Sequence, residues 1–104
     1  MDKATWLVGP NGTYRKDIIT GTSWYTWRDK PGGYVQIRID DTGPKLAEFD
    51  DVEVAERVCA RVSDWLLREG DTSLQVFANG TTALVDAGNV LTEVVHADGT
   101  TLGE

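Results

Sequence analysis

Cys59 and His96, the only cysteine and the only histidine in the chain, are its most reactive side chains. A nucleophilic thiol needs exposure and a nearby positive charge, and a zinc site needs several cysteine or histidine ligands at defined spacings. Two isolated residues meet neither condition. The aspartate pairs at 40–41 and 50–51 lack the spacing of a calcium loop. We therefore expect no metal site, no cofactor and no catalytic residues.

Two segments begin like catalytic motifs without completing them. Residues 7–13, LVGPNGT, open like the phosphate loop of ATPases, but Tyr14 and Arg15 stand where that loop requires glycine and lysine. Residues 83–88, ALVDAG, are similar to an aspartic protease segment, but Ala87 lacks the hydroxyl of that pattern. The chain after Asp86 is also too short for a flap and a supporting loop. Pro-Asn-Gly and Asp-x-Gly turns explain both segments better.

The best candidate for a binding site is a cluster of aromatic and basic residues around a predicted hairpin. Exposed Trp and Tyr beside Arg are typical of protein interfaces, because these side chains bury much area at a small cost in entropy. The predicted partner-binding residues of this hairpin are Trp24, Tyr25, Trp27, Arg28, Tyr34 and Arg38.

Two other interpretations of the cluster stay open. The tryptophans could fill the core of a small sheet, or the same side chains could stack on single-stranded nucleic acid. Alternation along residues 34–39 places Val35, Ile37 and Ile39 on one side of a strand and the intervening residues on the other. We expect the first set to face the core and either Trp24 or Trp27 to join the outer set.

Residues 49–70, FDDVEVAERVCARVSDWLLREG, have the only sustained helical periodicity. Asp50 is the predicted N-cap, Phe49 and Val54 form a hydrophobic staple, and Gly70 ends the helix. A helix of about 19 residues should therefore lay one apolar stripe on a sheet. Leu67 falls on the wrong face. The apolar arc consists of Val52, Val54, Ala55, Val58, Cys59, Val62, Trp65 and Leu66.

The opposite side of this helix is predicted to be polar and solvated. Glu53 and Arg57, and likewise Asp64 and Arg68, have the spacing of favourable ion pairs on a helix. The surplus of carboxylates could nevertheless dock a basic partner. Glu53, Glu56 and Asp64 therefore complete the set of predicted partner-binding residues.

Short strands separated by turns surround the helix. The predicted strands are residues 5–8, 13–19, 24–28, 34–39 and 45–49 before it, and 72–78, 81–85 and 90–95 after it. Residues 95–104 either fray or form a weak final hairpin. We expect one α+β domain over residues 1–104, with an antiparallel sheet of about six to eight short strands in meander–helix–hairpin order and the helix on one face. The alternative is a partly open barrel with one helix.

Charge and composition limit the classes of partner that this chain can bind. Residues 1–49 hold seven Lys and Arg against six Asp and Glu, a net charge of +1, whereas residues 50–104 hold three against eleven, a net charge of −8. A surface of net charge −7 repels nucleic acid overall and favours a protein partner with a basic patch. The sequence has no membrane-length apolar run and no signal segment, and its single cysteine suits a reducing cytoplasm.

These observations predict a small, acidic, cytoplasmic protein-binding module without enzymatic activity. An inhibitor, or an immunity or phage-type accessory protein that occupies a partner's surface, fits this description. The alternative is a single-stranded nucleic-acid-binding domain that uses the aromatic and basic face. The oligomeric state and the identity of the partner stay open.

Overall fold

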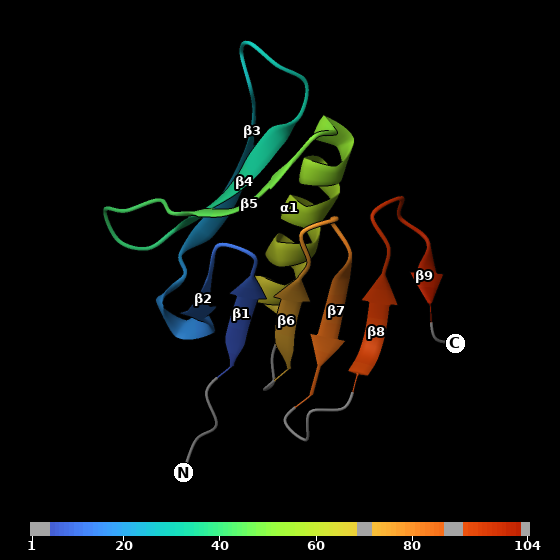
Figure 1. The fold of residues 1–104 in the computed structure, drawn as a ribbon. Helices are drawn as coiled ribbons and strands as arrows, with labels where there is room; N and C mark the ends of the chain where they lie inside the picture. The colour runs from blue at the N-terminus through green and yellow to red at the C-terminus, as the bar shows by residue number, and fades with distance from the viewer. Residues whose placement is uncertain (1–4, 69–71, 87–90, 103–104) are drawn as a thin grey trace.

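The computed structural model describes residues 5–68, 72–86 and 91–102, and within them the chain forms two open sheets and one α-helix (Figure 1). This arrangement confirms the predicted α+β class. The helix, α1, spans Val52–Leu67 and lies between the two sheets.

The larger sheet, sheet A, has the strand order β2-β1-β6-β7-β8-β9. Its neighbours pair antiparallel except β1 and β6, which run parallel with Leu7 opposite Leu74. A parallel pair requires a long crossover, and here the whole of sheet B and α1 provides it. The strands of sheet A are β1 (Trp6–Gly9), β2 (Gly12–Arg15), β6 (Ser73–Val76), β7 (Thr82–Val85), β8 (Leu91–Val95) and β9 (Thr101–Leu102).

The smaller sheet, sheet B, contains β3 (Gly21–Thr26), β4 (Gly33–Arg38) and β5 (Lys45–Phe49), all antiparallel. The sequence predicts one sheet, but a 3₁₀ turn, η1 (Lys16–Ile18), redirects the chain after β2. As a result β3 begins a separate sheet. A register shift between β4 and β5 lets the adjacent residues Leu46 and Ala47 both face the core.

The helix begins one residue later than predicted. Asp51, not Asp50, is the N-cap, and its carboxylate accepts a hydrogen bond of 2.9 Å from the Glu53 amide. The helix ends at Leu67, with Arg68 as an extended C-cap, and it is therefore shorter than expected. The predicted terminator Gly70 lies outside the described residues.

One hydrophobic core joins the helix to both sheets. Sheet A contributes Leu7, Leu74, Val76 and Leu84, whereas sheet B contributes Val35, Ile37, Leu46, Ala47 and Phe49. Val35 and Ile37 are fully buried, which confirms the predicted inward face of β4. Trp65 fills the centre from the helix and donates a hydrogen bond of 2.6 Å from its indole to the Thr72 carbonyl. Trp65 is thus the core tryptophan of this fold.

The polar side of α1 is less solvated than predicted, because its arginines reach across to sheet A. Arg61 donates to Glu93 on β8 at 2.7 Å, and Arg57 donates to the Ala97 carbonyl in the β8–β9 turn at 2.7 Å. That final hairpin is formed, with Val95 paired to Thr101. The helix therefore exposes only a narrow stripe to solvent.

Candidate binding surfaces

Three predicted aromatic residues meet on the face of sheet B that points away from the helix. Tyr25 and Tyr34 are cross-strand partners whose ring centroids lie 5.3 Å apart. Trp27 continues the row, with its centroid 4.8 Å from that of Tyr34. Tyr25 is 42% exposed, and Trp27 and Tyr34 are half-buried. We call Tyr25, Trp27 and Tyr34 the outer aromatic cluster.

Two lysines outside the predicted set of partner-binding residues lie over these rings. The Lys30 and Lys45 ammonium groups lie 4.6 and 4.8 Å from the centroid of Trp27, and Lys45 is also 4.8 Å from that of Tyr34. Such cation–π contacts hold the rings in place and occupy part of the surface on which a base would stack. Lys30 follows Trp27 by three residues in the same turn, so the sequence already places it near that ring. Lys45 has no such local signal, because it comes from β5, a different strand of sheet B.

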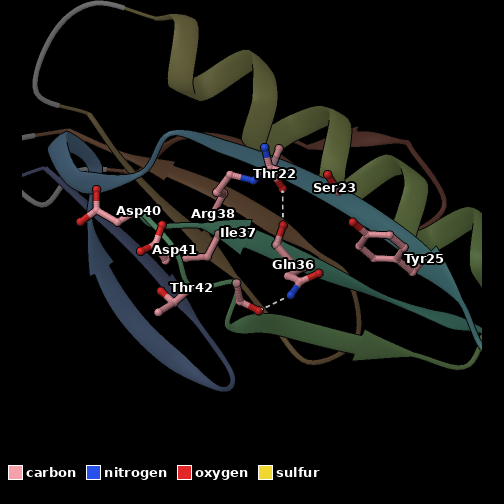
Figure 2. Close-up of a pocket in the computed structure, with 10 residues that line it drawn as sticks. Thr22, Ser23, Tyr25, Gln36, Ile37, Arg38, Asp40, Asp41 and Thr42 are labelled. Atoms are coloured by element: carbon pink, nitrogen blue, oxygen red, sulfur yellow. Dashed lines mark hydrogen bonds between the residues drawn. The ribbon is translucent and has the colours of Figure 1, made fainter.

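A polar hollow of about 180 Å³ lies next to the cluster on the same face of sheet B (Figure 2). Tyr25 borders one end, and Arg38, Asp40 and Asp41 border the other (Figure 2). The Gln36 side-chain amide donates to the Gly43 carbonyl and fixes the β4–β5 connection below it. Arg38 therefore lines the hollow, whereas the sequence predicts it in one cluster with the aromatic rings.

Trp24 lies on the other face of sheet B. It is the cross-strand partner of the buried Val35, so its side chain emerges on the helix side, and it is 37% exposed because β3 is an edge strand. The Thr22 hydroxyl, one step back on the same face, lies 3.8 Å from the Cys59 sulfur. β3 runs from Thr22 toward the end of sheet B at which α1 begins. Trp24 lies two residues further along this strand than Thr22, so it is at the same height as the helical turn that carries Glu53 and Glu56.

The three predicted carboxylates Glu53, Glu56 and Asp64 lie on the exposed stripe of α1. Ala60 and Leu67 share the stripe, and Leu67 is 84% exposed. Glu53 approaches Arg57 at 3.6 Å, whereas Arg68 has already left the helix and loses the predicted spacing to Asp64. We call Trp24, Glu53, Glu56 and Asp64 the helix-side surface. The predicted site residues therefore divide between two opposite faces of sheet B.

The remaining candidates stay separate. Arg28 is exposed in the β3–β4 turn. Cys59 is buried, and burial raises the pKa of its thiol against the smaller, lowering effect of hydrogen bonds with Thr22 and Ser63. His96 is exposed in the β8–β9 turn of sheet A, whereas the Cys59 sulfur lies beside the Thr22 hydroxyl of sheet B. Among the residues that the structure describes, no three Asp, Glu, His or Cys side chains are grouped to hold a metal.

The outward face of sheet A is a surface that was not predicted from the sequence. Side chains of sheet A alternate, so that Leu7 and Leu74 face the core while Trp6, Val8 and Val85 face outward. They line a hollow of about 390 Å³. Two further apolar side chains are exposed at this sheet, Phe77 just after β6 at 45% and Leu91 on β8 at 59%. The sequence carries a signal for this surface only in β1 and β7, where consecutive apolar residues indicate strands that are covered on both faces.

No family model matches this chain, and no curated protein or solved structure matches it either. Within the described ranges, no helix is long and apolar enough to cross a membrane.

Proposed function

We propose that this chain is a non-enzymatic binding module that docks on a basic patch of another protein through the helix-side surface. One observation carries the proposal: an exposed tryptophan and the carboxylates of the helix stripe lie on the same side of sheet B. Trp24 is level with Glu53 and Glu56, and Asp64 continues the stripe along the helix.

The physical roles of these residues differ. A tryptophan held on a strand can bury a large area against a partner with little loss of side-chain freedom, which is the usual property of an interface anchor. Carboxylates at the rim attract a basic partner and orient it, so they act mainly on the association rate. The helix positions Glu53, Glu56 and Asp64 about one turn or two apart, and Leu67 extends the stripe with an apolar contact.

This mode of action, in which a small domain occupies a partner's surface, is the mode expected of an inhibitor or an immunity-type accessory protein. The nucleic-acid alternative rests on the outer aromatic cluster. It has weaker support, because Lys30 and Lys45 already lie over the Trp27 and Tyr34 rings and a base would have to displace them. The net charge of −7 also opposes binding to phosphates.

The proposal is tested by quantitative affinity capture from a cell extract with matched charge variants. One variant neutralises the stripe with Glu53→Gln, Glu56→Gln and Asp64→Asn, and another is Trp24→Ala. The control neutralises three exposed carboxylates elsewhere with Asp29→Asn, Asp40→Asn and Asp41→Asn, so that the net charge changes equally. We expect a protein that wild type and the control capture and that both helix-side variants lose. Equal capture by all four proteins would refute the proposal.

A titration with a labelled single-stranded oligonucleotide separates the alternative. Binding at low salt that disappears in Tyr25→Ala/Trp27→Ala and persists in Trp24→Ala would favour the nucleic-acid function. We expect no binding by wild type under the same conditions.

A further inference from the structure

The outward face of sheet A is mostly apolar: six of its ten described outward residues are apolar and one is charged. The charged residue among those that the structure describes is Arg15, whose guanidinium pairs with Asp17 at 2.8 Å. Asp86 follows β7 at the rim of the hollow. In Figure 1 the helix lies behind this sheet. The outward residues are Trp6, Val8, Thr13, Arg15, Ser73, Gln75, Ala83, Val85, Leu91 and Val94.

A partner with a basic patch would gain nothing from such a face, because it offers no group of carboxylates. A second copy of this chain is different. Two molecules of net charge −7 repel each other, but face-to-face contact of sheet A keeps the acidic stripe of α1 away from the interface. Interfaces between identical copies are also more apolar than interfaces between proteins that associate transiently.

The shape of the face is self-complementary. The hollow lies over β1 and β6 and is bordered by Trp6 and Val8, whereas Leu91 projects from β8 in the same row of side chains as Trp6 and Val85. Two sheets A that face each other can be related by a two-fold axis that is parallel to the strands and passes between β6 and β7. Such an axis places β8 of one copy opposite β1 of the other. This symmetry places the Leu91 side chain of each copy over the hollow of its partner, and both contacts form at once.

We propose that this chain forms a symmetric dimer in which the outward faces of two sheets A pack together, with Leu91 of each copy in the hollow beside Trp6 of the other. Two sheets packed in this way lie about 10 Å apart with their strands nearly aligned. Five strands spaced by about 4.8 Å and about four residues long give each face a footprint of about 300 Å². This footprint is small for a specific interface, so the dimer forms at high protein concentration.

Sedimentation equilibrium tests the dimer on the whole chain between about 5 and 500 µM, a range that brackets weak interfaces. We expect the average mass of wild type to rise from 11.4 kDa toward twice that value. Leu91→Glu should stay monomeric over the range, because it would bury a charge in the partner's hollow. Leu67→Glu is the matched control: Leu67 is also an exposed leucine, but it lies on α1 and its variant should dimerise like wild type.

Both leucines are mostly exposed, so neither variant should unfold, and thermal melting confirms this. Wild type that remains monomeric throughout would overturn the proposal. A dimer that persists in Leu91→Glu, or that disappears equally in Leu67→Glu, would also overturn it. The helix-side surface contributes nothing to this interface, so these results are independent of the capture experiment.

Discussion

The guanidinium of Arg61 donates a hydrogen bond of 2.7 Å to the Glu93 carboxylate and connects the middle of α1 to β8. The same guanidinium lies 3.3 Å from the Thr82 hydroxyl on β7. The Arg61 side chain is only 19% exposed. A residue that helical periodicity assigns to the solvated face therefore holds the helix against sheet A.

A double-mutant cycle on Arg61 and Glu93 should give a measurable coupling free energy between the two side chains. We expect Arg61→Ala and Glu93→Ala to be coupled by about 1 kcal/mol in the free energy of unfolding, because the pair is half-buried and in direct contact. Glu53 and Arg57 provide the control, since they are more exposed and 3.6 Å apart. Their cycle should give about 0.3 kcal/mol. Equal couplings in urea denaturation would show that Arg61 does not hold the sheet.

Gly80 should tolerate alanine much less well than Gly99. Both have positive φ, at 95° and 93°, so each alanine variant bears similar backbone strain of about 1 kcal/mol. A Cβ at Gly80 would lie 2.3 Å from Val54 Cγ1, whereas a Cβ at Gly99 would lie 3.5 Å from its nearest neighbour, in Arg57. Gly80→Ala should therefore cost at least about 2 kcal/mol more than Gly99→Ala in chemical denaturation.

The Val54→Ala background supplies the control for this comparison. Removing the valine methyl groups gives the Gly80 Cβ room, so the cost of Gly80→Ala should fall toward that of Gly99→Ala. An unchanged difference would contradict the packing of the β6–β7 turn against the start of α1.

The β8–β9 turn should weaken in acid. The Thr100 amide donates to the Asp98 carboxylate at 3.0 Å and its hydroxyl donates at 2.7 Å, and these bonds lower the pKa of Asp98, the amide bond most. A carboxyl with a lowered folded-state pKa stabilises the fold above its unfolded pKa, and the effect is lost as the pH falls through the folded value. We expect the Thr100 amide to exchange faster with solvent as the pH drops below about 4, relative to its intrinsic rate. Asp98→Asn should abolish that dependence, and a pH dependence retained in the variant would assign it to another group.

The Cys59 thiol should report on the contact between β3 and α1. Cys59 is 8% exposed, and burial raises the pKa of its thiol, so both access and thiolate formation are suppressed. Native protein should react with a disulfide reagent at least about 100-fold more slowly than urea-unfolded protein at the same pH. Similar rates in the two states would show that the contact opens freely.

Local patterns in the sequence predicted the helix and the side of β4 that faces it. The apolar arc around Val58 and Val62 is buried, and the alternation through Val35 and Ile37 identifies the core side of β4. Trp27 joins the outer set, as one of the two predicted alternatives. Each of these features depends on residues close together in the chain, so periodicity alone is sufficient to read it.

Features that depend on residues distant in the chain were not predictable in the same way. The parallel pairing of Leu7 with Leu74 and the contact of Arg61 with Glu93 both join segments that have no local signal for each other. Trp24 and Tyr25 are neighbours in sequence but lie on opposite faces of β3. Grouping them as one site therefore joined two surfaces that the sheet separates.

The central claim is that a protein partner docks on the helix-side surface, and a photo-crosslinker incorporated in cells tests it most directly. A photoreactive phenylalanine analogue at Ala60, an exposed position in the middle of the stripe, should give a discrete crosslinked product. Adding Trp24→Ala should remove that product. The same analogue at Thr42, exposed beside the polar hollow of sheet B, should give none. Crosslinking from Thr42 but not from Ala60 would contradict the claim.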